Sequence, residues 1–183
     1  LPMSEKPVQT IVKTDQGELA FQEYFVKYQC APKVEQINYV GNETAEIPIY
    51  LKELINKNKL SGVIICPSNP YLSVDPILSI NEIKTFLLET SIPILAISPI
   101  IANDSIKGPT SKIMREMKIN PSVESIAQHY SELIDVLVID HKDANCHPMT
   151  DSMTFIVDSI YMSNLEDKIS LATNCLEKIK ELS

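Results

Sequence analysis

Residues 61–97, SGVIICPSNPYLSVDPILSINEIKTFLLETSIPILAI, decide the fold class. They open with a short apolar run (61–66) and close with a second one (91–97), and an amphipathic segment with helical spacing lies between them. Two apolar strands joined by a helix form a unit of a parallel sheet, because parallel neighbours need a long crossover connection. The stretch therefore predicts an α/β protein.

The same alternation continues along the rest of the chain. Short apolar runs at 136–140 and 153–158 predict two more strands, and apolar residues recur at helical spacing in 49–57 and 122–134. We therefore expect a single α/β domain over 1–183, in which a mostly parallel sheet carries helices on both faces.

The first 40 residues have a different pattern and predict an N-terminal β-hairpin region. VQTIVKT (8–14) and LAFQEYFVKY (19–28) are rich in strand-forming residues and flank a turn at 15–17. VEQINYV (34–40) adds a third strand, which ends before Gly41.

Two Ser-x-x-Glu patterns predict helix starts. SINE (79–82) and SNLE (163–166) match the capping box, with Ser79 and Ser163 as the N-caps. The second pattern opens the last helix. We expect its inward positions to be Leu165, Ile169, Ala172, Leu176 and Ile179.

Composition limits the partners of the chain. Its 183 residues include 16 Lys and Arg against 24 Asp and Glu, a formal net charge of −8. This charge disfavours a nucleic acid or an anionic membrane as partner, and a small anion would need a local positive site. No apolar run reaches the roughly 18–20 residues that span a bilayer. Four scattered cysteines without a Cys-x-x-Cys pair indicate reduced thiols and a cytoplasmic protein.

Two loops leave the carboxyl ends of predicted parallel strands, where open α/β sheets bind ligands. The first, CPSNPYLSVDPIL (66–78), offers Ser68, Asn69 and Ser73, whose short side chains and accessible amides suit phosphate or sugar hydroxyls. Its prolines stiffen the loop, so less ordering entropy is lost when a ligand binds. The alternative is a rigid turn in which Asn69 bonds its own backbone.

The second loop, SPIIANDSIKGP (98–109), leads into a helix that we expect to reach about residue 118. Lys107, Gly108 and Lys112 lie around the start of that helix, where a cation is mildly unfavourable against the helix dipole. A glycine lets another group approach the backbone closely, and the amides of a helix start can bind an anion. Two interpretations stay open: an anion site that the lysines complete, or two solvated lysines at a small energetic cost.

Other polar clusters are weaker candidates. HKDANCH (141–147) gathers His, Asp and Cys but lacks a recognised zinc spacing. Asp135, Asp140 and Asp143, near a strand end, suit either magnesium or the capping of turns. The chain has no Ser/His/Asp order, phosphate-binding loop motif or Gly-x-Gly-x-x-Gly. The residues alone therefore predict an anion or nucleotide site on an α/β sheet.

Three segments together resemble one family. LPMSEKPVQTIVKTDQGELAFQEYFVK, CPSNPYLSVDPIL and SPIIANDSIKGPTSKIMREM, in that order, are similar to the 2-phospho-L-lactate transferases of deazaflavin coenzyme F-420 biosynthesis. The resemblance runs from residue 1 nearly to the end of the chain. It implies a Rossmann-like fold. It also implies that the chain is the C-terminal portion of a longer transferase, because the family's glycine-rich N-terminal strand, loop and helix are absent.

The resemblance further implies a reaction, its partners and its site. Family members transfer a 2-phospho-L-lactyl group from lactyl-diphospho-guanosine to the deazaflavin precursor Fo, release GMP and require Mg²⁺. A homodimer is implied by the family alone. The matching positions divide into those that would contact the nucleotide or its phosphates (Ser68, Asn69 and Ser73) and those of the neighbouring wall (Ser98, Lys107, Gly108 and Lys112).

The chain departs from the family pattern at two places. Ala102-Asn103 or Asn103-Asp104 replaces a small-glycine pair, and Ser159-Ile160 replaces an Asp-Thr pair. Two other functions compete with the transferase. One is a non-catalytic regulator on the same fold that binds a nucleotide or sugar nucleotide, similar to gluconeogenesis-factor-like proteins. The other is a structural domain that another chain completes.

Overall fold

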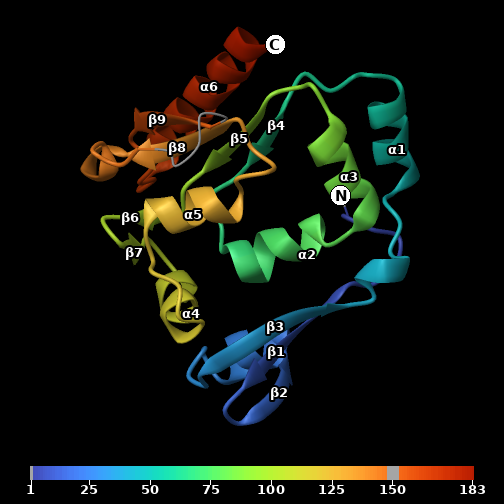
Figure 1. The fold of residues 1–183 in the computed structure, drawn as a ribbon, viewed down its shortest axis with the longest axis vertical. Coiled ribbons are helices and arrows are strands. Elements are labelled where there is room, and N and C mark those ends of the chain that lie inside the picture. Colours follow the sequence, from blue (N-terminus) through green and yellow to red (C-terminus); the bar gives the residue numbers. More distant parts are fainter. Residues whose placement is uncertain (1, 148–152) are drawn as a thin grey trace. The chain divides into compact units, whose positions relative to one another are not determined.

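The computed structural model describes residues 2–147 and 153–183, and Figure 1 shows its helices and strands. The chain divides into two compact units. The antiparallel unit comprises residues 1–59, 69–89 and 112–119, and the parallel unit comprises residues 60–68, 90–111 and 120–183. Each unit has its own sheet and its own buried cluster of apolar side chains.

The antiparallel unit contains the predicted hairpin region. Strands β1 (Gln9–Thr14), β2 (Gly17–Ala20) and β3 (Val34–Val40) form a sheet in the order β2-β1-β3, with both pairings antiparallel. Thr14 pairs with Gly17 at the tight turn, where Gly17 has a φ of 108° that suits glycine. The first and third predicted strands are therefore confirmed.

The predicted strand over 19–28 is wrong beyond Ala20. Residues Glu23–Lys27 instead form a short π-helical turn, η1. Two pairs spaced by four residues favour the helical conformation: Lys27 donates to Glu23 at 2.7 Å, and the rings of Phe21 and Phe25 lie 5.4 Å apart. Tyr24, between them, is fully buried. Strand-forming residue types in this stretch therefore predicted the wrong secondary structure.

Helical segments complete the antiparallel unit. They are η2 (Asn42–Thr44), α1 (Ile49–Asn56), η3 (Pro70–Val74), α2 (Asp75–Leu78) and α3 (Asn81–Glu89). Apolar residues of α1, of α3 and of the segments next to the helices form a small core: Ala45, Ile47, Ile80, Met3, Val8, Leu51, Ile55 and Ile83.

The capping box predicted at 79–82 is wrong. Ser79 ends α2 instead, and its hydroxyl donates to the carbonyl of Pro76 at 2.8 Å. The Glu82 carboxylate accepts from the amide of Ile47 at 2.8 Å and pairs with Lys52 at 3.1 Å. These bonds lower the pKa of Glu82, with the backbone amide as the main cause. Ser79 therefore belongs to the end of α2 and does not cap α3. Glu82 instead binds the amide of Ile47, 35 residues earlier in the chain.

The parallel unit contains the sheet that the central stretch predicted. Strands β4 (Val63–Ile65), β5 (Ile94–Ile97), β8 (Val136–Asp140) and β9 (Thr154–Asp158) pair in that order, and every pairing is parallel. A two-stranded hairpin, β6 (Ile100–Ile101) and β7 (Asp104–Ser105), follows β5. The unit also holds α5 (Val123–His129), η4 (His141–Asp143) and α6 (Leu165–Leu182), while α4 (Thr110–Glu116) is divided between the two units.

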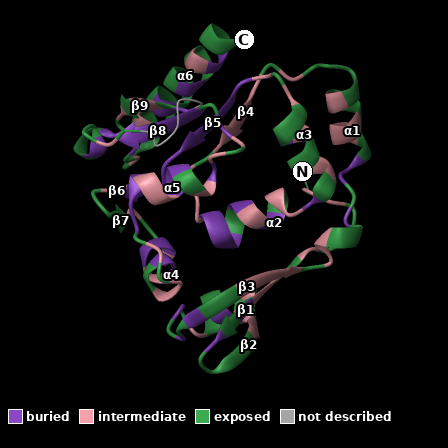
Figure 2. Cartoon of the chain, in the orientation of Figure 1, coloured by how far each residue is buried: buried purple, intermediate pink, exposed green. Residues whose placement is uncertain are grey.

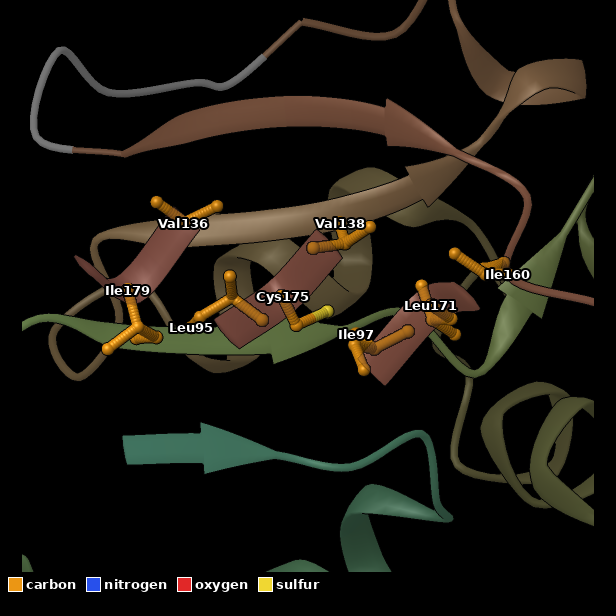
Figure 3. Close-up of a cluster of buried hydrophobic side chains, with 8 residues drawn as sticks. All are labelled: Leu95, Ile97, Val136, Val138, Ile160, Leu171, Cys175 and Ile179. Atoms are coloured by element: carbon orange, nitrogen blue, oxygen red, sulfur yellow. The ribbon is translucent and has the colours of Figure 1, made fainter. Parts of the chain in front are cut away.

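Helix α6 packs on one face of this sheet. Its side chains Leu171, Cys175 and Ile179 meet Leu95 and Ile97 of β5 and their neighbours on β8, as Figure 3 shows. The alternate strand residues, which point to the other face, are buried as well: Ile94, Ala96, Leu137 and Ile139. Both faces are thus covered, as a mostly parallel sheet requires. The fold is the expected α/β fold with an N-terminal antiparallel sheet.

The inward face predicted for the last helix is wrong except at Ile179. Leu165, Ile169 and Leu176 are 69%, 57% and 53% exposed, and Figure 2 shows the exposed side of α6. The capping box also lies one residue later than predicted, with Asn164 as N-cap and Asp167 as its partner. The helix carries a wider band of apolar residues than the sheet covers. Spacing alone could not show which half of that band packs inward.

Within the part of the chain that the structure describes, no helix combines the length and the apolar character needed to cross a membrane.

Candidate functional site

The loop after β4 is built around Asn69. Its Oδ1 accepts the backbone amide of Leu72 at 3.0 Å and so caps η3, which begins with Pro70. Ser68 is half-buried and Ser73 is exposed. The interpretation of this loop as a rigid turn is therefore confirmed for the oxygen of Asn69.

The other end of the Asn69 amide has no such partner. Its Nδ2 is buried and makes no hydrogen bond within the described chain. A buried amide donor without an acceptor costs about 1–3 kcal/mol. This nitrogen is thus a donor of Asn69 that the cap made by Oδ1 does not use.

The loop after β5 is shaped by the β6–β7 hairpin. Ala102 and Asn103 form its two-residue turn, with φ of 49° and 63°. The pair that occupies the turn is therefore Ala102-Asn103 rather than Asn103-Asp104. Both carboxylate oxygens of buried Asp143 accept the amide of Ala102, at 3.1 and 3.0 Å. A residue 41 positions away thus holds this turn.

Two predicted wall residues have internal roles in the same loop. Ser98 is fully buried, and its hydroxyl donates to the carbonyl of Ile100 and accepts the amide of that residue. Gly108 has a φ of 71°, and a Cβ placed there would touch nothing within 4 Å. Glycine is therefore favoured here by backbone conformation, because the space around it is open.

The two lysines of the predicted anion site differ in their surroundings. Lys112 Nζ pairs with Glu116 at 2.6 Å and donates to the carbonyl of Pro32 at 3.0 Å. Lys107 is exposed, and no carboxylate of the described residues pairs with it. The charge of Lys112 is thus neutralised by Glu116 inside the antiparallel unit, whereas Lys107 is exposed and can pair with an anion from solution.

Ser111 adds a second unsatisfied group. Its side chain is 2% exposed, and its Oγ has no hydrogen-bond partner. Among residues 2–147 and 153–183, only three buried side-chain polar atoms lack a partner: the Tyr24 hydroxyl, Asn69 Nδ2 and Ser111 Oγ. Two of the three thus belong to the two segments that sequence reasoning selected.

The predicted site residues are divided between the units. Ser68, Ser98, Lys107 and Gly108 belong to the parallel unit, and Asn69, Ser73 and Lys112 belong to the antiparallel unit.

The alternative metal interpretations find no support in the described residues. No group of three or more His, Cys, Asp or Glu side chains there is arranged to hold a metal ion. Asp135 precedes β8 and accepts the amide of Ile94, whereas Asp140 ends that strand, so these two do not share a strand end. Burial and the nearby Glu124 carboxylate raise the pKa of Cys146 to about 11, so its thiol stays protonated.

A cleft that sequence reasoning missed lies in the parallel unit. It has a volume of about 630 Å³ and is lined by residues that follow β8 and β9 and by the β6–β7 hairpin. An acidic residue that closes an apolar strand, Asp140, was the available signal.

Comparison with known proteins places the chain in a family. Residues 1–168 match the model of the family described as 2-phospho-L-lactate transferase CofD. The chain is 35% identical over 185 residues to the 2-phospho-L-lactate transferase of Methanopyrus kandleri, covering 99% of this chain and 57% of that protein. It is 33% identical over 179 residues to that of Methanococcoides burtonii, covering 98% and 56%.

Solved structures agree on the fold. A UPF0052 family protein from Bacillus halodurans matches with a TM-score of 0.59 and 14% identity, covering 94% of this chain and 60% of that protein. A second structure of the same Bacillus halodurans protein, BH3568, matches with a TM-score of 0.63 and 12% identity, covering 96% of this chain and 61% of the BH3568 chain. The chain spans somewhat more than half the length of the curated relatives it matches. The match over 1–168 nevertheless shows that this chain belongs to the 2-phospho-L-lactate transferase family.

Proposed function

We propose that this chain carries the nucleotide-binding part of a 2-phospho-L-lactate transferase. The reaction is transfer of a 2-phospho-L-lactyl group from lactyl-diphospho-guanosine to the hydroxyl of the deazaflavin precursor Fo, with release of GMP. The family match over residues 1–168 supports the reaction class. The runner-up is a non-catalytic regulator on the same fold that binds a nucleotide or sugar nucleotide. The solved structures show the fold alone and do not favour it over the transferase.

One observation about the site carries the proposal. The two segments selected as anion-binding each contain a buried polar atom without a partner, Asn69 Nδ2 and Ser111 Oγ. Native proteins satisfy nearly all buried polar groups, so unsatisfied ones indicate partners outside the chain. A phosphate oxygen is a suitable acceptor for an N–H or O–H donor of this kind, and each unit contains one such donor.

The residues fit group transfer without a covalent nucleophile. Such reactions need positioning and neutralisation of the charge that develops on the phosphoryl oxygens. In this proposal, the amide of Asn69 is a phosphate donor of the antiparallel unit. The unpaired charge of Lys107 offsets negative charge of the diphosphate in the parallel unit. Mg²⁺, when bound, would supply further neutralisation. It would depend on phosphate oxygens of the substrate as ligands, as Mg²⁺ commonly does, because the described residues offer no three-ligand cluster.

Calorimetry with GDP tests the proposal, with and without Mg²⁺. The decisive variant is Asn69→Asp, which keeps the oxygen that caps η3 but replaces the donor nitrogen with an acceptor. We expect GDP binding to weaken by about 1.5–3 kcal/mol, because a charge-assisted bond is lost and a like charge faces the phosphate. The matched control, Asn81→Asp, adds the same charge at an exposed position of the same unit.

The outcomes separate the candidate functions. GDP binding that depends on Mg²⁺, is lost in Asn69→Asp and is retained in Asn81→Asp supports the transferase. Tighter binding of a UDP-sugar or NAD than of GDP would favour the regulator. Equal affinity of wild type and Asn69→Asp for GDP would exclude the proposed role of the Asn69 nitrogen.

We also propose that the chain forms a homodimer through the exposed side of α6. Leu165, Ile169 and Leu176 are spaced as in a helix–helix seam. Exposed Glu166 lies in the first turn and exposed Lys180 in the last. An antiparallel pair of α6 helices would therefore place each Glu166 beside Lys180 of the partner subunit.

Sedimentation equilibrium tests this dimer. Ile169→Glu should give a monomer, because it places a charge in the seam. Glu166→Lys should weaken association through repulsion, and the double reversal Glu166→Lys/Lys180→Glu should restore it. A wild-type chain that stays monomeric at high concentration, or a double reversal without rescue, would rule out the antiparallel arrangement.

A further inference from the structure

The cleft of the parallel unit is placed where open α/β sheets bind ligands, beyond the carboxyl ends of parallel strands. Asp140 is the last residue of β8, and Ser159 directly follows β9. Ile101 and Ile106 give the cleft apolar walls, and Tyr161, 56% exposed, presents an aromatic ring. Its volume of about 630 Å³ lies within the range of small-molecule sites.

Of the three carboxylates that line this cleft, Asp140 is the buried one. It is 7% exposed, and its Oδ1 accepts the amide of Lys142 at 3.1 Å. No other donor reaches it within the described residues. Asp167 is only half-buried, and its Oδ2 accepts from Ser163 and Asn164 in the capping box of α6. A buried carboxylate that accepts a single hydrogen bond from the described residues favours a further donor on a ligand.

The charges of the cleft define the kind of ligand. Three carboxylates, Asp104, Asp140 and Asp167, line it together with Lys142 and His141. This balance is unfavourable for another phosphate and favourable for a neutral group rich in donors. A vicinal diol can donate two O–H groups to a carboxylate at a strand end, and a flat ring can stack on a tyrosine.

We propose that this cleft binds the nucleoside half of the donor, with the ribose hydroxyls on Asp140 and the base against Tyr161. The inference rests on the proposed function and extends it by making Asp140 the residue that distinguishes a ribose from a sugar without the two hydroxyls. Ile106 of the cleft immediately precedes Lys107, whose open charge is assigned to the diphosphate. The chain thus connects an anionic and a neutral half-site within one unit.

The test compares GDP with 2′,3′-dideoxy-GDP by calorimetry. Wild type should bind GDP about 10- to 100-fold more tightly, the range for hydrogen bonds to a charged group. Asp140→Ser retains an oxygen that can accept the amide of Lys142 but removes the second carboxylate oxygen, so it should bind both nucleotides alike. The matched control is Asp158→Ser, because Asp158 is the register partner of Asp140 on β9 and does not line the cleft. It should keep the wild-type preference.

The outcomes distinguish this inference from the proposed function. If GDP binds but wild type does not prefer it over the dideoxy analogue, the ribose site is wrong and the nucleotide function stands. If GDP does not bind at all, the proposed function fails. The cleft is then tested with uncharged guanosine, by NMR of the Ile101 and Ile106 methyl groups. Shifts that disappear in Asp140→Ser support the cleft, and unchanged spectra overturn it.

Discussion

The two loops that follow neighbouring strands β4 and β5 are held in opposite ways. The loop after β4 is fixed by a local bond, in which Asn69 accepts the amide of Leu72, three residues later. The loop after β5 is fixed at a distance, because Asp143 binds the amide of Ala102 across 41 residues. Pro70 restricts the first loop, whereas the second contains two residues with positive φ. The conformation of the first loop can therefore be predicted from neighbouring residues in the sequence. That of the second cannot, because it depends on a distant residue.

Asp143→Ala should cause the largest effect, since it removes the distant support of the second loop. The amide of Ala102 then loses a charged acceptor, and we expect a loss of roughly 2 kcal/mol in unfolding free energy. For a chain of this size the melting temperature falls by about 4–8 °C. Thermal denaturation followed by circular dichroism measures this. Asp143→Asn, which keeps one acceptor oxygen, should lose clearly less, and equal stability of all three proteins would contradict the role assigned to the carboxylate.

Asn69→Ala tests the local bond of the first loop. It removes the cap of η3, so we expect a loss of about 1 kcal/mol, typical of an N-cap deletion. Chemical denaturation gives the value. Asn69→Asp should retain most of the stability because it keeps the capping oxygen. If Asn69→Ala and Asn69→Asp are equally destabilised, the cap does not determine this loop.

Much of the fold could be predicted because its signals are local. The short apolar runs 61–66, 91–97 and 136–140 became parallel strands, since burial on both faces needs apolar side chains throughout. Prediction was wrong where two local solutions compete. Residues 19–28 suit a strand by composition, but the pairs Phe21–Phe25 and Glu23–Lys27 favour a helical turn.

The candidate site was only partly predictable for the same physical reason. Asn69 and Gly108 were identified by residue type, because a cap and a positive φ depend on nearby backbone. Lys112 looked equivalent to Lys107 in sequence, yet its partners include Pro32, 80 residues away. The cleft around Asp140 joins three separate segments, and no single stretch contains that pattern.

Lys112→Ala and Lys107→Ala test this difference between two lysines of one segment. Lys112→Ala leaves Glu116 and the carbonyl of Pro32 without their cation, and we expect a loss of up to about 1 kcal/mol, because the pair is partly exposed to solvent. Lys107→Ala should leave stability within about 0.5 kcal/mol of wild type. It should instead weaken GDP binding and reduce its salt dependence. If Lys107→Ala lowers stability more than Lys112→Ala does, the roles given to the two lysines are wrong.

Asn103→Gly should give the smallest effect, with the opposite sign. Both turn residues of the β6–β7 hairpin have positive φ, and glycine is favoured at the second position of such turns. We expect a gain of about 0.5 kcal/mol, limited by the greater flexibility that glycine gives the unfolded chain. Urea denaturation of Asn103→Gly beside Asn103→Ala measures it, and Asn103→Ala should be the least stable of the three proteins. If the glycine variant is less stable than wild type, the interactions of the Asn103 side chain outweigh the relief of backbone strain at this turn.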